Sequence, residues 1–381
     1  MGRGEAFVAT ADNASAIYYN PAGITQLHGL NLRAGAYGIY IRPTYDSPAG
    51  SSFANEKTLQ AAPQFFATYG FQDSKLSLGL GIYAPYGLSL RWPQDTGFRT
   101  LGIESSLTYL SINPVLAWRI TPTFSVGAGL TINYADAELK SGLAWPTQAS
   151  DEFKFRGSGW DVGYNLGALW KVSEQVSLGA SFRSSTTITL DGHTTYRNDA
   201  AIGGIPAFSE QRVDAQADVH FPWNAVAGIS YRPTPKWNLE FDADYTDWSS
   251  MDTVTIHQGS GPLLPRDIPS ELNWKPAWYY KAGATRYLDD GWSISAGYIY
   301  AQNAIPDSHY TPLVADSDKH FVNIGIGHRG PRWEFDIAYQ IGFSAGSRSV
   351  SGSQPSPSGQ TVDGRYTYLS HAVLVTVGYH F

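Results

Sequence analysis

The chain has no cysteine, few charged residues and no long apolar run. Its 381 residues include no Cys, and only 15% are Asp, Glu, Lys or Arg. Disulfides and thiolate chemistry are therefore excluded, which suits a protein that crosses an oxidising periplasm. The net charge of −7 argues against nucleic acid as a partner. No stretch of about eighteen apolar residues occurs, so transmembrane helices are excluded as well.

What the sequence does have is aromatic residues, glycine and a regular period of two. Aromatic residues make up 14% of the chain, and 39 residues are Gly. Residues 332–344 alternate between apolar and polar or small side chains throughout, as do residues 124–134 and 237–245. This period is that of a β-strand with two different faces. Such lengths exceed the roughly five or six residues of a soluble strand and match the roughly nine to eleven needed to cross a bilayer at a tilt.

The alternation predicts an all-β fold, an antiparallel transmembrane β-barrel in which only alternate residues meet lipid. Fourteen strands are expected, near residues 30–41, 62–71, 75–86, 107–119, 123–138, 157–172, 175–190, 217–232, 235–250, 274–287, 291–302, 319–329, 331–344 and 366–381. Six tight turns alternate with seven long loops, near residues 42–61, 87–106, 139–156, 191–216, 251–273, 303–318 and 345–365. This arrangement is typical of outer-membrane barrels and places both chain ends in the periplasm.

Aromatic residues beside the short turns support the membrane interpretation over a large soluble β-sandwich. The expected interfacial girdle consists of Trp118, Trp170, Tyr231, Trp237, Tyr287, Trp292 and Trp333. Along residues 332–344, the side chains expected to meet lipid are Phe335, Ile337, Tyr339, Ile341 and Phe343, and those expected in the lumen are Glu334, Asp336 and Gln340. The terminal Phe381 resembles the signal that the barrel assembly machinery reads during biogenesis.

The first 29 residues break this pattern. Residues 5–23 are rich in alanine and do not alternate, and Asp12, Asn13 and Ser15 are suited to capping short helical turns. Pro21 fits the first turn of a helix after Asn20. Because the segment is compact and apolar and precedes the first strand, we expect it to fold into the lumen.

The string Asn20-Pro21-Ala22 resembles the N-terminal hatch of the FadL/TodX-like outer-membrane family, which imports long-chain fatty acids and other hydrophobic compounds. Further segments resemble this family in the same order along the chain: 86–88, 221–223, 245–249, 287–292, 305–306 and 316–318. The resemblance implies a monomeric fourteen-stranded barrel, residues 30–381, whose lumen is plugged by a helical hatch, residues 1–29. It also implies capture of the ligand by outer loops, an internal site, and lateral release through a kink in the third strand.

In this chain the kink would lie at Pro85, Tyr86 and Gly87. Proline cannot donate to a strand ladder and glycine allows a bend, although these residues could also simply open the next loop. The capture surface would be the apolar residues of that loop: Leu88, Leu90, Trp92, Phe98, Leu101 and Ile103. Other apolar loop residues are Ile202, Ile205, Phe208, Leu263, Leu264 and Ile268. Alternatively these loops pack on one another over the barrel mouth, and both interpretations can hold.

A carboxylate head group would favour a cation beside the apolar site. Lys140 and Lys275 occupy positions that resemble those of head-group contacts in the family, although the family has its basic residue one position after Lys140, where this chain has Ser141. Arg183 and Lys281 lie on polar strand faces, where Glu240, Asp242 or Asp336 could pair with them. For each cation, an ordinary ion pair is the alternative to a ligand contact.

Three functions remain open from the sequence. The first is a hatch-gated importer in the Gram-negative outer membrane, surrounded by lipid and lipopolysaccharide, for fatty acids, aromatic hydrocarbons or alkanes. The second is a general porin, suggested by the lumen carboxylates Glu240, Asp242, Asp244, Glu334 and Asp336. The third is a lipid-modifying enzyme, but no catalytic motif, metal-ligand set or cofactor motif supports it. Residues 1–4 lack the apolar core of a signal peptide, so we expect a version of the chain without its signal and with further hatch residues missing.

Overall fold

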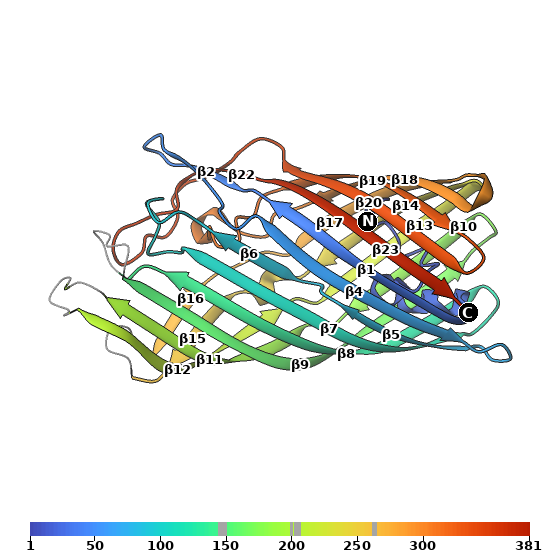
Figure 1. Cartoon of the computed structure of the whole chain (residues 1–381), viewed down its shortest axis with the longest axis horizontal. Coiled ribbons are helices and arrows are strands. Elements are labelled where there is room, and N and C mark those ends of the chain that lie inside the picture. The colour runs from blue at the N-terminus through green and yellow to red at the C-terminus, as the bar shows by residue number, and fades with distance from the viewer. Residues whose placement is uncertain (144–150, 199–200, 202–206, 261–264) are drawn as a thin grey trace.

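The computed structural model describes residues 1–143, 151–198, 201, 207–260 and 265–381. In this part of the chain the main sheet closes on itself, because β1 (Gly29–Ile41) pairs with both β4 (Leu59–Gly70) and the last strand, β23 (Leu369–His380). Figure 1 shows the resulting barrel with its long axis horizontal. The fold is therefore the predicted fourteen-stranded antiparallel β-barrel.

The described wall consists of continuous and interrupted strands. Besides β1, β4 and β23, the continuous strands are β7 (Glu104–Arg119), β8 (Phe124–Ser141), β9 (Glu152–Lys171), β18 (Trp292–Ala301), β19 (Lys319–Arg329) and β20 (Trp333–Ser344). The interrupted strands are β5 (Leu76–Tyr83) with β6 (Gly87–Arg91), β10 (Val176–Arg183) with β11 (Thr186–Asn198), β12 (Phe208–Phe221) with β13 (Asn224–Thr234), β14 (Trp237–Thr246) with β15 (Thr253–Gln258), and β16 (Asp267–Glu271) with β17 (Ala277–Tyr287).

The connections differ at the two ends of the barrel. Tight turns, one of them containing the 3-10 helix η3 (Asp289–Gly291), lie at the end near the C-terminus, and the long loops gather at the opposite end (Figure 1). At the loop end a separate sheet is formed by β2 (Thr44–Asp46), β3 (Ser52–Ala54), β21 (Arg348–Val350) and β22 (Gly364–Thr367). The loops also contain the short helices η2 (Trp248–Ser250) and η4 (Asp307–His309). The predicted alternation of short and long connections is confirmed.

The two faces of the wall have the chemistry that the alternation predicts. In β20, Ile337 and Tyr339 are exposed on the outer surface, whereas Glu334 and Gln340 are buried inside. The girdle residues that are exposed beside the short turns are Trp118, Trp170, Tyr231, Trp237, Trp292 and Trp333. The prediction for Tyr287 is wrong, because its position in β17 turns its side chain inward, where it lines a cavity.

The wall extends further toward the loop end than the sequence predicts. Residues 191–216 are predicted to be a loop, yet β11 continues to Asn198 and β12 begins at Phe208. The prediction is wrong because the faces exchange character there: Tyr196 and Ala215 are buried inside, whereas Asp191 and Gln216 are exposed outside. A strand that continues beyond the bilayer meets water on its outer face, so the lipid-facing pattern is lost. Strand residues also occupy parts of the predicted loops 42–61, 87–106, 139–156, 251–273 and 345–365.

A buried ion-pair network joins the first strand to the thirteenth across the closing seam. The Arg33 guanidinium in β1 donates to Glu334 and Asp336 in β20 and, at 2.7 Å, to the Thr376 hydroxyl in the intervening β23. The side chains of Arg33 and Glu334 are 8% and 5% exposed. A buried ion pair is costly to break on one side only, because the remaining charge is left uncompensated.

We therefore expect Arg33→Ala to destabilise the barrel by up to about 3 kcal/mol, since Asp336 would lose its ion pair and the buried Glu334 would keep only Arg329 and His380 beside it. The measurement is the midpoint of denaturant unfolding of the purified protein in detergent, followed by the shift between folded and unfolded bands on a gel. Arg42→Ala is the matched control, because Arg42 is exposed just beyond β1. Equal midpoints for the two variants would show that the network does not hold the seam.

Candidate functional site: the barrel interior and the third strand

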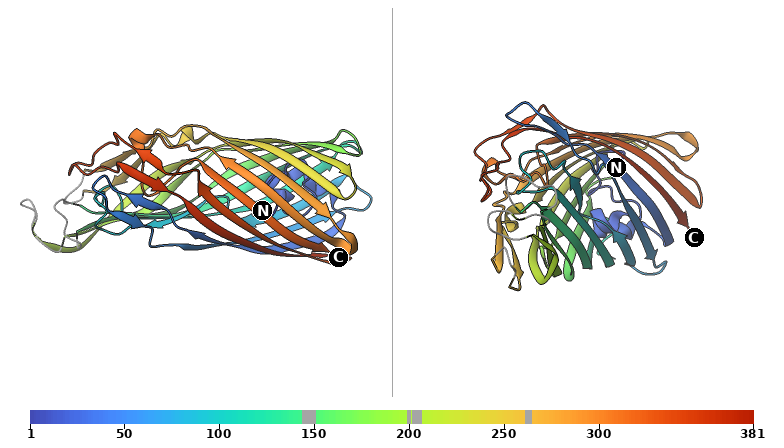
Figure 2. Two further views of the ribbon diagram at one scale, coloured as in Figure 1. Left: turned by 90° about the horizontal axis from the view of Figure 1, so that it is seen from above. Right: turned by 60° about the vertical axis from the view of Figure 1, so that its left-hand side comes forward.

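The N-terminal segment, residues 1–28, lies inside the barrel (Figure 2). It contains a turn of α-helix, α1 (Ala16–Tyr19), and a 3-10 helix, η1 (Pro21–Gln26). Among the described residues, no helix is long and apolar enough to cross a membrane. Small side chains let the segment pack closely on the wall, and its fully buried residues include Ala6, Ala11, Ala16, Ile17, Ala22 and Ile24.

Glycines on the inner face of the wall make room for this segment. At Gly167 in β9, an added Cβ atom would lie 2.3 Å from the Oδ1 atom of Asn20. At Gly179 in β10, it would lie 2.0 Å from the carbonyl oxygen of Val8. The same crowding occurs on the neighbouring strands at Gly127 and Gly228. Only residues without a side chain allow the backbone of the segment to approach the wall so closely.

Two carboxylates of β14 hold the start of the segment. Asp242 Oδ2 accepts the N–H groups of residues 7 and 8 at 2.7 and 3.0 Å, and Glu240 Oε1 accepts those of residues 9 and 10 at 2.7 and 3.2 Å. Arg3 also donates to Glu240, at 3.2 Å. Hydrogen bonds to charged groups contribute about 1.5 to 3 kcal/mol each, so these four bonds are a strong attachment.

Asn20 ties the two halves of the segment to each other and to the wall. Its Nδ2 donates to the carbonyl oxygens of Val8 at 2.7 Å and of Ala168, in β9, at 2.9 Å, and its Oδ1 accepts the N–H of Ala22 at 3.1 Å. Pro21 occupies the first position of η1, where no N–H donor is needed. The Asn20-Pro21-Ala22 string is therefore the point at which the segment turns back against β9.

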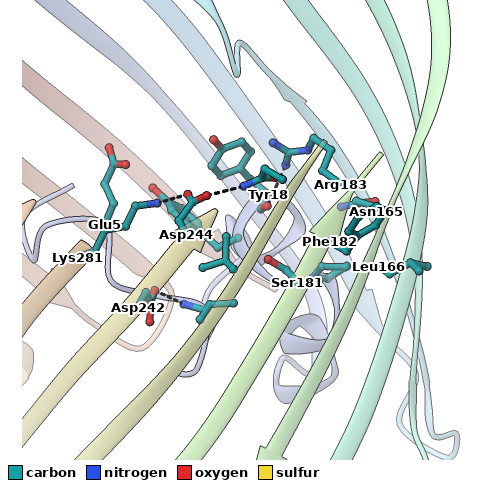
Figure 3. Close-up of a pocket in the computed structure, with 15 residues that line it drawn as sticks. Glu5, Tyr18, Asn165, Leu166, Ser181, Phe182, Arg183, Asp242, Asp244 and Lys281 are labelled. Carbon is teal, nitrogen blue, oxygen red and sulfur yellow. Dashed lines mark hydrogen bonds and ion pairs between the residues drawn. The ribbon is translucent and has the colours of Figure 1, made fainter. Parts of the chain in front are cut away.

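The remaining lumen carboxylates of the sequence analysis are ion-paired. Asp244 Oδ2 lies 2.8 Å from Lys281 Nζ, and Glu334 and Asp336 share Arg33. Cavities of about 30 Å³ (Figure 3) and about 180 Å³ remain between the segment and the wall. The smaller is about the size of one water molecule. The acidic side chains that suggested a porin thus bind protein groups instead of lining a free channel.

The wall is interrupted at its third strand, at residues 84–86 between β5 and β6. The ladder between β4 and β5 ends at Phe65 and Ile82, and β6 pairs only with β7 in the described part of the chain. Residues 59–64 of β4 therefore lie beside residues 83–88 without ladder pairs. The register with β7 also shifts by one residue between Tyr83 and Gly87, so the third strand carries a bulge. We call this interruption the third-strand break.

Side chains close the third-strand break at the loop end. Gln60 Nε2 donates to the carbonyl oxygen of Ser89 at 2.9 Å, and the N–H of Arg91 donates to Asn55 Oδ1 at 2.8 Å. In β4, Pro63 lies beside the break, where a residue without an N–H is tolerated because the strand has a free edge. The break is thus a local gap in the ladder, bounded by pairing on both sides.

Tyr86 points from the break into the barrel. Its ring centroid lies 5.1 Å from that of Tyr109, 5.3 Å from that of Phe221 and 5.9 Å from that of Trp248. We call these four residues the Tyr86 cluster. Its rings join the third strand to β12 across the interior. Toward the loop end it continues into a buried apolar cluster that includes Phe153, Phe155, Ile188, Leu190, Tyr196 and Ile256.

The apolar residues predicted to capture a ligand lie within the packed loops. Trp92 and Phe98 are 1% and 0% exposed, Leu90 and Ile103 are also buried, and Leu88 and Leu101 pack partly against them. The same cluster contains residues of the small outer sheet and of the last loops: Tyr45, Tyr310, Val350 and Tyr366. In this conformation the loops pack on one another over the barrel mouth. Ile202, Ile205, Leu263 and Leu264 lie outside the described residues.

Lys140 and Lys275 lie away from the interior. The alternation of β8 turns Leu139 inward and Lys140 outward, and Lys140 Nζ lies 2.7 Å from Glu152 Oε2. Lys275 is exposed between β16 and β17. The structure therefore brings neither lysine to the Tyr86 cluster.

Arg183 and Lys281 do face the interior, and Figure 3 shows both beside the small cavity. Lys281 pairs with Asp244, which is not among the partners predicted from the sequence. Of those predicted partners, Glu240 and Asp242 bind the N-terminal segment, and Asp336 pairs with Arg33. In the described part of the chain, Arg183 forms no ion pair.

Sequence reasoning missed how the N-terminal segment is attached. Glu240 and Asp242 are more than 220 positions away from the N–H groups that they accept, so no local pattern links them. Glycines at positions predicted to face the lumen, such as Gly167 and Gly179, are the signal that could have indicated close contact with another backbone. No comparable feature of the sequence indicates that the side chain of Tyr86 points into the barrel.

Comparison with known proteins agrees with this geometry. The family of outer membrane protein transport proteins (OMPP1/FadL/TodX) matches residues 1–381. The long-chain fatty acid transport protein of Escherichia coli strain K12 is 23% identical over 378 residues, which cover 88% of this chain and 82% of that protein.

Two solved structures share the fold. A Pseudomonas aeruginosa FadL homologue has a TM-score of 0.84 at 18% identity and is matched over 99% of this chain and 97% of its own. The Pseudomonas putida toluene transporter TodX has a TM-score of 0.79 at 17% identity, over 100% and 96%. Since the family match spans the whole chain, this protein belongs to the OMPP1/FadL/TodX family of transport proteins in the bacterial outer membrane.

Proposed function

We propose that this protein imports hydrophobic molecules, with long-chain fatty acids as the principal substrates. Loops would capture the ligand, the interior would bind it, the N-terminal segment would act as a hatch, and the third-strand break would release it sideways into the membrane. The observation that carries the proposal is the combination of an apolar interior at the loop end, a filled lumen below it and an interrupted wall between them.

The hatch role is supported by how the N-terminal segment is held. Its apolar anchor is one small cluster, in which Ile17 and Ile24 pack against Phe66 and Val115 of the wall, because many of its other buried side chains are alanine. The charged hydrogen bonds of Glu240 and Asp242 make the main polar attachment. Hydrogen bonds can be exchanged for water more readily than a large apolar contact can be opened. A segment of this kind is suited to local movement while the wall stays intact.

Lateral release is supported by the surroundings of the third-strand break. Beyond the Tyr86 cluster toward the periplasm, the N-terminal segment fills the interior, and charged groups such as Asp242, Asp244 and Lys281 line part of the space that remains. An apolar ligand that has passed the Tyr86 cluster could move in two directions. Sideways, through the break, it would meet lipid; further toward the periplasm, it would meet polar groups. Transfer of apolar surface into lipid is favourable by about 25 cal/mol per Å² relative to water, so the sideways route is the favourable one.

Fatty acids are favoured as substrates by the name of the Escherichia coli relative, the long-chain fatty acid transport protein. Aromatic hydrocarbons are the second candidate, because the Tyr86 cluster offers ring contacts and the TodX structure is that of a toluene transporter. We further propose that the protein works as a monomer among outer-membrane lipid and lipopolysaccharide, and that Phe381 serves its insertion by the barrel assembly machinery.

The direct test is ligand binding and conductance of the purified protein. We expect it to bind a fluorescent long-chain fatty acid and to give no steady ion conductance in planar bilayers, because the lumen is filled. Growth of a deletion strain on fatty acids, alkanes and aromatic hydrocarbons identifies the substrate class in cells. A large steady conductance without lipid binding would favour the general porin.

Gly179→Val should open an ion path through the barrel. The new side chain would overlap the carbonyl oxygen of Val8, so the hatch would be pushed from its place and conductance would rise. Gly38→Val is the control, because no atom lies within 4 Å of a Cβ atom at that position. If both variants fold and conduct no more than the wild type, the segment does not gate the lumen as proposed.

Deletion of Pro85 should abolish uptake without abolishing binding. The deletion removes the extra residue of the bulge. It also removes the one residue there that has no backbone N–H to donate, so that the third strand can pair continuously. Uptake of labelled fatty acid by cells and binding by purified protein are measured side by side. Deletion of Gly50 in an exposed loop is the control for losing one residue. Normal uptake after Pro85 is deleted would rule out exit through the third-strand break.

A further inference from the structure

A pocket of about 480 Å³ opens among the outer loops, and we call it the outer-loop pocket. Its walls come from the first, second and last long loops, at residues 45–53, 95–97 and 358–363. In Figure 1 these loops lie at the end of the barrel where β2 and β22 are labelled, away from the N-terminal segment. The volume is within the range of about 300 to 1,000 Å³ that is usual for small-molecule sites. The pocket is therefore a candidate binding site outside the barrel interior.

Gln360 gives the outer-loop pocket a buried hydrogen-bond donor. Its side chain lines the pocket, and the residue is 7% exposed. Gln360 Oε1 accepts the N–H of Thr100 at 2.8 Å, and the Thr100 hydroxyl lies 2.7 Å from the same oxygen. Because a backbone N–H only donates, this bond fixes which end of the amide is the oxygen. The Nε2 atom therefore lies on the other side, where it is buried and has no hydrogen-bond partner among the described residues.

Asp95 gives the pocket an acceptor. The residue is exposed in the second long loop, and in the described part of the chain its carboxylate forms no ion pair and accepts no hydrogen bond. Asp363 lines the pocket as well, but its oxygens already accept the N–H groups of residues 352 and 353, at 3.1 and 2.9 Å. No Lys, Arg or His is among the described residues that line the pocket, so its charge is negative.

An aromatic ring and several hydroxyl groups complete the wall of the pocket. Phe53 in β3 is partly exposed, and the buried Tyr45 in β2 stacks against it, with the ring centroids 6.0 Å apart and the ring planes at 18°. Ser51 and Thr361 add side-chain hydroxyls, each of which both donates and accepts hydrogen bonds. The pocket thus offers one apolar surface beside donors and acceptors that have no fixed partner.

We propose that the outer-loop pocket binds a neutral saccharide. The Nε2 atom of Gln360 requires an acceptor and the Asp95 carboxylate requires a donor, and the hydroxyl groups of a sugar supply both. The C–H face of a sugar ring is apolar and would pack on the exposed side of Phe53. A buried donor without an acceptor is costly, so the contact with Gln360 favours the bound state.

Other classes of ligand fit this pocket less well. A fatty acid or a phosphate would bring a negative charge toward Asp95 with no cation to offset it. A protonated amine has no lone pair for Gln360, and a hydrocarbon would leave both polar groups unpaired. The inference goes beyond the proposed import function and does not depend on it, because the pocket is separate from the barrel interior.

A bound saccharide would also hold the loops together over the barrel mouth. Tyr45 belongs to the same buried cluster as Trp92 and Tyr366, and Gln360 joins the last loop to the second through Thr100. One ligand would therefore bridge three loops. Sugars reach this end of the protein from two sources, the sugar chains of the surrounding lipopolysaccharide and free saccharides in the medium.

The experiment measures saccharide binding to the full chain, purified in a detergent with a polyoxyethylene head group, since a sugar-headed detergent would compete. Binding of glucose, galactose, mannose and N-acetylglucosamine is followed by saturation-transfer NMR and titration, with glucuronate as the charged comparison. We expect the wild type to bind at least one neutral sugar and to bind glucuronate more weakly.

Two variants test the groups that carry the proposal. Gln360→Glu keeps the acceptor for Thr100 and removes the donor, and Asp95→Ala removes the free carboxylate; each should weaken binding about tenfold. Asp252→Ala is the matched control, because Asp252 is an exposed carboxylate of another outer loop, and it should bind as the wild type does. Asp95 lies in an exposed loop, so Asp95→Ala tests the site even if Gln360→Glu fails to fold.

The source of the sugar is identified by titrating the core oligosaccharide of lipopolysaccharide in parallel. Competition by this oligosaccharide would assign the pocket to lipopolysaccharide, and binding of the free sugars alone would assign it to saccharides of the medium. Folded wild-type protein that binds no saccharide, or that prefers glucuronate, would overturn the proposal, as would unchanged affinity in both variants. Fatty acid binding is measured in the same samples, and its absence would count against import alone.

Discussion

The structure depends on one constraint: every backbone N–H and C=O group that faces lipid must be paired. The closed ladder from β1 to β23 meets it around the barrel. The third-strand break is a place where the ladder of the described wall is incomplete, and side chains such as Gln60 and Asn55 supply part of what is lost. Unpaired backbone groups in a membrane wall cost free energy, and this cost is the physical reason for proposing that the break serves transport.

The same constraint explains why the sequence predicts the wall well. A lipid-facing strand must be apolar on alternate residues, and residues 332–344 carry this pattern from end to end. Where the strands leave the bilayer, their outer faces no longer need to be apolar. In the extensions of β11 and β12 the apolar side chains face inward and the polar ones outward, so the lipid-facing pattern does not predict these extensions. The aromatic girdle lies beside the short turns because outward-facing side chains there meet the membrane interface. Tyr287 lies beside a turn as well, but it is on the inner face of β17 and therefore points into the barrel.

The interior is less predictable because its contacts join residues far apart in the chain. Asn20-Pro21-Ala22 indicates the hatch through a resemblance, but its partners Gly167 and Ala168 are known only from the fold. Lys140 and Arg183 show the same limit. Lys140 lies just beyond the end of a predicted strand and Arg183 lies within one, yet Lys140 faces outward and pairs with Glu152, while Arg183 faces inward and pairs with no acid among the described residues. Charge and residue type do not distinguish them; direction and neighbours do.

Polarity changes along the axis of the barrel, and in the proposed import route this change would give transport its direction. Apolar side chains fill the loop end as far as the Tyr86 cluster, whereas the N-terminal segment below is held by charged hydrogen bonds centred on Glu240 and Asp242 as well as by a small apolar cluster. An apolar tail gains free energy down to the cluster and would lose it among those carboxylates. Lipid beyond the third-strand break is the next apolar environment, so lateral release as proposed would need no energy source. In the proposed route the filled lumen would offer no alternative path, and the polar attachment of the N-terminal segment would then be as important for specificity as the apolar surface above it.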